Sequence, residues 1–234
     1  MSDYILLPES KEHPDIEVAK YRLASTEEVR RAGKYLGLIL KNNDQGFTGC
    51  IDHRQALDIT SRLNGFTLFP GYFAEFLGLV RKRINDRIKN VYDENGERVT
   101  KEELKSINSD ITEARGQWRS EHLGLYCFEK DGKHHVGYNK LDSNSRLIPV
   151  EEPLEECLMQ DKFPGIDMEY WLNNTTPQGF PSRNNPDGEL WYGHPIVNSV
   201  ARFLANSGRA GLDCGGNPRG SGSDLGVRLA RAKI

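Results

Sequence analysis

The sequence predicts an α+β fold in which a helix-rich first half is followed by strands and long loops. Three observations predict it. Apolar residues recur at helical spacing within residues 21–122, and from Leu123 the pattern changes to one typical of strands. Short apolar segments also stand near both ends of the chain. With 234 residues the chain can bury a core without disulfides or metals, so we expect one domain over residues 1–234.

The first elements are expected to be a strand and two helices. Tyr4–Leu7 is a short apolar run, which favours a terminal strand. Ser25–Glu28 has the spacing of a capping box, and apolar residues follow it at helical intervals: Val29, Ala32, Leu36 and Ile39 or Leu40. Asp52 is expected to cap a second helix that runs to Arg62, because Asn64–Gly65 is a helix-ending pair.

Two more helices complete the first half. The third has an apolar stripe and ends before Asn95–Gly96; the stripe is formed by Phe73, Phe76, Leu77, Val80 and Ile84. Thr100–Glu103 has the composition of a helix start, and we expect the fourth helix to run from there toward His122. The first half is therefore predicted to contribute four helices.

The second half is expected to be a hairpin, loops and a final strand. Leu123–Phe128 and Val136–Tyr138 flank Asp131–Gly132, a pair typical of hairpin turns. The following chain reads mostly as loop, with Pro, Gly and Asn crowded into 173–188 and aromatic residues nearby to hold it on a core. Leu225–Ile234 alternates like a strand, with Val227 and Leu229 on one face, and we expect it to pair with Tyr4–Leu7.

Composition excludes several classes of protein. The net charge of −3 argues against a nucleic-acid-binding protein, and no run approaches the ~20 apolar residues of a membrane span. The N-terminus lacks a basic segment, so we expect no signal peptide and synthesis in the cytoplasm, with virion association left open. The cysteines form no C-x-x-C pair and are expected to be reduced thiols: Cys50, Cys127, Cys157 and Cys214.

The segment from Tyr192 to Ala232 has an unusual composition. Its 41 residues contain no Lys, Glu, Gln, Met or Trp, although uniform composition predicts about nine. Every residue type present can be encoded by an Asn codon changed at its first two bases, and the five missing types cannot. A flexible Gly/Ser linker is the simplest alternative, but the aromatic pair Trp191–Tyr192 and the final apolar strand favour a segment with fixed ends.

A family resemblance rests on this segment. Ser207–Ala210, Pro218, Ser221 and Leu225–Arg228 together resemble the C-terminal variable region of the target proteins of diversity-generating retroelements. In that family, adenine-specific mutagenic reverse transcription rewrites Asn-type codons on a C-type-lectin-like fold. The resemblance implies such a fold here, with added N-terminal helices and paired terminal strands, a variable region at about 192–232, and an archaeal, viral or mobile-element source.

The resemblance also implies a non-enzymatic display protein that binds a protein or cell-surface ligand. Its variable, ligand-binding positions are expected to be Ser199, Ala201, Arg202, Phe203, Ala205, Leu212, Asp213, Gly215, Arg219, Gly220, Gly222, Ser223 and Asp224. Leu225, Val227 and Leu229 are expected to anchor one end of the segment, and Trp191 with Phe203 or Ile196 the other. The calcium-ligand patterns of sugar-binding lectins are missing, so neither a metal nor a cofactor is expected, and no catalytic residue is assigned.

Other groupings give weaker indications of function. His134–His135 lies in the predicted hairpin, where neighbours point to opposite faces, so the pair does not favour a metal site. Gly220–Gly226 lacks the strand and helix of a dinucleotide loop, and Glu151–Glu156 is most simply a solvated face. The alternative is an enzyme of the formylglycine-generating type, because Gly226–Arg228 resembles the C-terminal strand of those enzymes. Their chemistry needs paired active cysteines, and Cys214 is the only cysteine near this strand.

Overall fold

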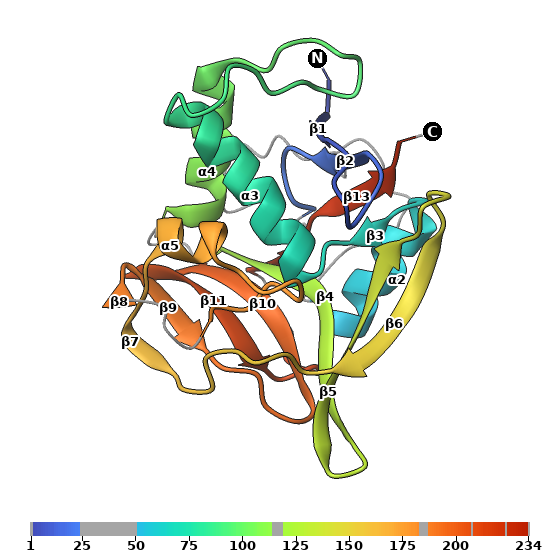
Figure 1. The fold of residues 1–234 in the computed structure, drawn as a ribbon, viewed down its shortest axis with the longest axis vertical. Helices are drawn as coiled ribbons and strands as arrows, with labels where there is room; N and C mark the ends of the chain where they lie inside the picture. Colours follow the sequence, from blue (N-terminus) through green and yellow to red (C-terminus); the bar gives the residue numbers. More distant parts are fainter. Residues whose placement is uncertain are drawn as a thin grey trace.

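The computed structural model describes residues 2–23, 51–113, 119–182, 187–206, 208–222 and 224–233. Within these residues the chain is α+β, as expected, with four helices and two β-sheets (Figure 1). The helices are α2 (His53–Arg62), α3 (Pro70–Ile84), α4 (Lys101–Thr112) and α5 (Met168–Asn173). The helix expected after Ser25 lies outside the described residues. None of the described helices is long and apolar enough to cross a bilayer.

The strands form a small sheet and a large one. The small sheet has the order β1-β2-β13-β3, and its strands are β1 (Tyr4–Leu7), β2 (Ile16–Ala19), β3 (Phe66–Thr67) and β13 (Leu229–Ala232). The large sheet has the order β6-β5-β4-β10-β11-β9-β7-β8, with β12 paired to β4. Its strands are β4 (Arg119–Lys130), β5 (Lys133–Leu141), β6 (Leu147–Pro153), β7 (Lys162–Ile166), β8 (Asp187–Gly188), β9 (Leu190–Gly193), β10 (Ser199–Asn206), β11 (Arg209–Gly216) and β12 (Leu225–Val227).

The main core lies between the large sheet and the helices α3 and α5. Figure 1 shows α3 above the large sheet, with its lower end near β4, and α4 beside it. Phe73 of α3 contacts Phe203 of β10 at a ring distance of 5.1 Å, and Trp171 of α5 stacks on the same ring at 6.3 Å. These aromatic contacts hold β10 against the helical layer.

The helix starts agree with the sequence pattern. Asp52 and Gln55 form a reciprocal capping box at α2, and the Thr100 hydroxyl accepts a hydrogen bond from the Glu103 amide at α4. α5 was not predicted, and the end of α4 was predicted wrongly. The helix stops at Thr112, because Glu113 is already extended, and His122 lies in β4 instead.

The prediction that the terminal strands pair directly was wrong. β2 lies between β1 and β13, so the two terminal strands share a sheet without hydrogen bonding to each other. All four residues of β2 are buried, which suits a central strand, but Glu17 interrupts its apolar run. Glu17 accepts a hydrogen bond from Arg231 of β13 at 2.6 Å, and this contact explains a carboxylate at a central position.

The C-terminal segment is two strands rather than one. The chain passes from β12 in the large sheet to β13 in the small sheet at Arg228. Arg228 is buried, donates to both carboxylate oxygens of Glu121, and donates to the Ala19 carbonyl at 2.9 Å. Val227 and Leu229 pack in the same hydrophobic cluster, which agrees with the prediction that they share one face.

The hairpin was predicted correctly, but the chain beyond it is not mostly loop. Asp131 and Gly132 both have positive φ in the turn between β4 and β5. Beyond them the chain forms the remaining strands, including the long pair β10 and β11 inside the segment 192–232. These two strands are rich in Gly, Ala and Ser, which have weak strand propensity. Hydrogen bonding to a neighbouring strand on each side therefore stabilises them as strands.

Candidate ligand-binding face

The predicted variable positions divide into a buried group and an accessible one. Five of them are at most 1% exposed: Ser199, Ala201, Phe203, Ala205 and Leu212. Their side chains pack into the core because alternate residues of a strand face the same side of the sheet. The expectation that these five positions face solvent was wrong.

Seven predicted positions remain at least partly accessible, and we call them the C-terminal face: Arg202, Asp213, Gly215, Arg219, Gly220, Gly222 and Asp224. Ser223 lies outside the described residues. Arg202 and Asp213 are directly opposite each other on β10 and β11, and the other five lie on β11 or between β11 and β12. The C-terminal face therefore continues from the sheet onto one loop.

Arg202 holds this loop in place. Its guanidinium donates hydrogen bonds to the Asn217 carbonyl and, at 3.1 Å, to the Gly220 carbonyl. Burial lowers the pKa of Arg202, while Asp213 and Asp224 oppose that change. Arg202 is thus better suited to position the loop than to contact a ligand.

Main-chain contacts fix the rest of the loop. The Gly220 amide donates to the Asn217 carbonyl at 2.9 Å, and the His53 amide of α2 donates to the Pro218 carbonyl at 3.3 Å. A β-bridge also joins Gly222 to Ile51. Since none of these bonds uses a side chain of the loop, exposed residues such as Arg219 can change without loss of the contacts that hold it.

Asp213 and Gly215 form the part of the C-terminal face that lies on β11. Burial raises the pKa of Asp213, although the Gly215 amide, which donates to its carboxylate at 3.1 Å, and Arg202 both lower it. A Cβ added at Gly215 would lie 3.4 Å from the His194 carbonyl and 3.9 Å from Ile196. Gly215 therefore has room for a side chain beside Ile196, which is 44% exposed.

Residues that the sequence analysis did not select extend the same surface. A recess of about 130 Å³ near the β10–β11 turn is lined by Trp191, Leu204, Asn206, Arg209, Ala210 and Gly211. Leu204 and Asn206 follow Arg202 at every second position, so they belong to its side of β10. Neighbouring residues of a strand face opposite sides, so placing Phe203 in the core would have predicted that Leu204 and Asn206 are accessible. Trp and Arg, both present here, are the residue types most often dominant in binding interfaces.

Two histidines lie beneath the loop. The rings of His53 and His122 are 5.8 Å apart, and both side chains are buried. Burial is the largest cause that lowers the pKa of His53 to about 3 and that of His122 to about 4, and the positive charge of Arg202 contributes to both values. The Nδ1 atoms of both rings make no hydrogen bond to any described group.

The remaining groups from the sequence analysis are placed as follows. His134 is exposed and His135 packs on Phe128, so the pair does not converge. No cluster of three or more possible metal ligands occurs among the described His, Cys, Asp and Glu residues. In the acidic run, Glu152 and Glu155 turn into a pocket, contrary to the expected solvated face.

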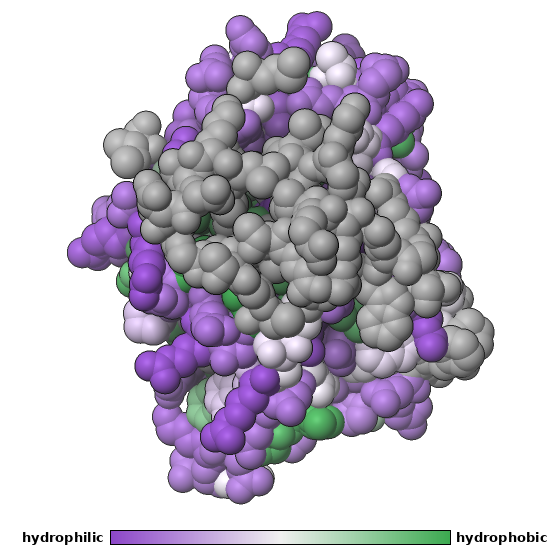
Figure 2. Space-filling view, turned by 180° about the vertical axis from the view of Figure 1, so that it is seen from behind, coloured by the Kyte–Doolittle hydropathy of each residue, from purple (hydrophilic) through white to green (hydrophobic). Residues whose placement is uncertain are grey.

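Comparisons with protein-family models, curated proteins and solved structures gave no match. Figure 2 shows the side of the molecule opposite to Figure 1, where the described surface is mostly hydrophilic and hydrophobic areas are small.

Proposed function

We propose that the chain is a non-enzymatic ligand-binding protein of the diversity-generating-retroelement type, built on a C-type-lectin-like fold. Its C-terminal face binds a macromolecular ligand, namely a host or cell-surface protein to which the protein attaches. The observation that carries the proposal is the loop Asn217–Gly222, which is held by main-chain contacts, by Arg202, and by the Asn217 side chain, which accepts a hydrogen bond from the Arg219 amide. A surface that must accept many side chains needs a backbone held in this way.

Composition supports the same proposal. The residue types missing from 192–232 are those that rewriting of Asn codons cannot produce. The accessible positions in this segment belong to one continuous surface, and the buried positions alternate with them along β10. Variation at accessible positions only would leave the core unchanged, so binding can diversify while the fold persists.

The enzymatic alternative needs a reactive thiol near the C-terminus. Cys214 is buried, and its pKa is raised well above the ordinary value by that burial. Thiolate is the nucleophilic form of cysteine, so this environment opposes the chemistry of formylglycine-generating enzymes. Arg228, in the segment that resembles theirs, forms a buried ion pair with Glu121 instead.

The test is a comparison of two small libraries displayed on yeast. One library varies Asp213, Gly215 and Arg219, and the other varies the five buried positions. Gly220 and Gly222 stay fixed, because a Cβ there would lie 2.9 Å from Arg202 and 2.4 Å from Asp224, respectively. Selection uses purified hen lysozyme as a model protein ligand, and folding is read from resistance to a protease. We expect the first library to yield folded binders and the second to lose folding, because exposed changes usually cost less than about 0.5 kcal/mol. Loss of folding throughout the first library would contradict the proposal.

A further inference from the structure

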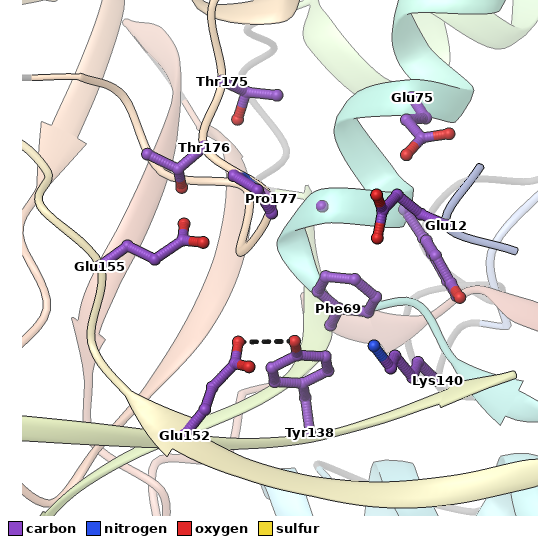
Figure 3. A pocket seen from close by; sticks show the side chains of 12 residues that line it. Glu12, Phe69, Glu75, Tyr138, Lys140, Glu152, Glu155, Thr175, Thr176 and Pro177 are labelled. Carbon is purple, nitrogen blue, oxygen red and sulfur yellow. Dashed lines mark hydrogen bonds between the residues drawn. The ribbon is translucent and has the colours of Figure 1, made fainter. Parts of the chain in front are cut away.

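A second pocket lies apart from the C-terminal face and has a different chemistry. Its volume is about 290 Å³, and it is lined by the start of α3, the strands β5 and β6, and the loops that contain Glu12, Glu155 and Thr175–Pro177 (Figure 3). The residues that matter most are Phe69, Tyr72, Glu75, Tyr138, Glu152 and Glu155. None of them belongs to the C-terminal face, so the inference drawn from the pocket does not rest on the proposed function.

The pocket is strongly acidic. Glu12, Glu75, Glu152 and Glu155 all line it, and the only basic side chain among the lining residues is Lys140. His13 Nε2 lies 2.8 Å from a carboxylate oxygen of Glu75. Carboxylates in excess of cations in a confined space favour a positively charged ligand.

Two of these carboxylates are fixed in position by a buried glutamine. The Gln178 side chain donates to Glu152 at 2.8 Å, and its main-chain amide donates to Glu155 at 3.2 Å. In return, the Glu155 amide donates to the Gln178 side chain at 3.0 Å. Tyr138 also donates to Glu152 at 2.8 Å, the contact drawn in Figure 3. Gln178 is only 1% exposed, so this arrangement is part of the folded core and not a flexible surface cluster.

Tyr72 provides an independent indication of a ligand. It lines the pocket and is 1% exposed, yet its hydroxyl forms no hydrogen bond with any described group. Burial raises its pKa to about 12; the Leu141 amide opposes this rise without completing a hydrogen bond. An unpaired buried hydroxyl is costly, and a ligand with a polar group in the pocket would remove that cost.

Aromatic rings form one wall of the pocket. Phe69 stacks on Tyr138 at a centroid distance of 4.3 Å and contacts Tyr72 at 4.4 Å. Ring faces attract organic cations and also pack against the carbon atoms that carry the charge. A hydrated metal ion would gain little from such a wall.

The geometry points to a binding site for an organic cation, an ammonium or guanidinium group whose charge meets Glu152 and Glu155 and whose carbon atoms contact Phe69 and Tyr138. Such a group can come from a free polyamine or from a basic side chain of a partner protein. Guanidinium groups suit paired carboxylates, because their N–H groups donate in a planar fork.

Isothermal titration calorimetry on the full chain tests this site with two cationic probes, spermidine and the capped tripeptide acetyl-Gly-Arg-Gly-amide. The same tripeptide with citrulline in place of arginine is a neutral control of nearly equal shape. We expect saturable one-to-one binding of at least one cation, and at least about tenfold weaker binding of the citrulline peptide. The preferred probe identifies the source: spermidine a free polyamine, the tripeptide a protein side chain.

Variants then locate the binding. Glu152→Gln and Glu155→Gln remove charge but keep an acceptor for Tyr138 or Gln178, and each should weaken binding about tenfold or more. Tyr72→Phe removes the unpaired hydroxyl and should weaken binding without lowering the melting temperature. Glu151→Gln, on the same strand but exposed, is the matched control and should bind like the native chain. Equal binding of the citrulline peptide, no saturable binding of either cation, or native affinity in Glu152→Gln and Glu155→Gln would overturn the inference.

Discussion

Acidification should destabilise the protein through the two buried histidines beneath the C-terminal face. The pKa values of His53 and His122 are lowered by burial to about 3 and about 4, against 6.5 in the unfolded chain. Because the pKa of each histidine is lower in the folded state, the unfolded state binds more protons than the folded state at any pH between the two pKa values. The stability contributed by the neutral rings is therefore fully present above about pH 6.5 and is lost as the pH falls toward 4 and 3.

The size of the effect follows from the same values. At pH 5 each histidine lies about 1.5 pH units below its unfolded pKa of 6.5, and one unit corresponds to about 1.4 kcal/mol. The pair should therefore reduce the free energy of unfolding by about 2–4 kcal/mol between pH 7.5 and pH 5. For a chain of this size that is a fall in melting temperature of roughly 4–16 °C.

Other titrating groups either oppose this change or act outside the window. Burial lowers the pKa of His13, but Glu75 and the Pro14 carbonyl raise it above 6.5 overall, so His13 stabilises the fold on acidification and offsets part of the loss. The lowered pKa of Asp161 gives a contribution that is lost only as the pH falls below about 4. The net slope between pH 7.5 and pH 5 therefore keeps the sign set by the buried pair.

Urea unfolding, followed by tryptophan fluorescence at pH 7.5, 6 and 5, measures the effect. The double variant His53→Gln/His122→Gln should have a flatter pH dependence than the native chain. The matched control is His134→Gln, which changes an exposed histidine and should leave the dependence unaltered. Equal or greater stability at pH 5 than at pH 7.5, or an unchanged slope in the double variant, would refute the reasoning.

Two further predictions concern stability. Arg228→Met should cost about 3–5 kcal/mol in chemical denaturation, because Glu121 would keep a buried charge without its partner; a cost below about 1 kcal/mol would contradict this. Gly211→Ala should cost about 1–3 kcal/mol or more, because its Cβ would lie 2.3 Å from the Trp191 carbonyl oxygen. Gly215→Ala, on the same strand, would place its Cβ no closer than 3.4 Å to any neighbour and should change stability by less than about 0.5 kcal/mol; equal costs for the two glycines would count against this account of the face.

Local chemistry made several elements predictable from the sequence. The caps at Asp52 and Thr100 and the turn at Asp131–Gly132 each depend on residues within three or four positions of one another. Pro70 at the first position of α3 is a local signal of the same kind that the sequence analysis did not use; an amide at this position has no acceptor within the helix, so proline is tolerated there. Such features need no knowledge of distant parts of the chain.

Features that depend on tertiary pairing were not predictable in the same way. β10 and β11 contain few β-branched residues, so their strand structure depends on neighbouring strands. Because those strands could not be read from the sequence, Leu212 was expected on the surface, and Phe203 was expected both as a variable position and as a possible anchor. Both are core residues. The acidic pocket was missed because Glu12 and Glu75 come from segments far in sequence from Glu152 and Glu155, and only the fold brings them together.

The central claim, a variable C-terminal face, is tested most directly by sequencing the DNA around the coding region. The account predicts a near-copy of the last ~120 bases, about the length that encodes residues 192–232, beside a reverse-transcriptase gene. The two copies should differ chiefly at adenines, with differences concentrated at codons of accessible positions such as Asp213, Gly215 and Arg219 rather than at those of Phe203 and Leu212. Absence of the near-copy, or differences spread equally over buried and accessible codons, would contradict it.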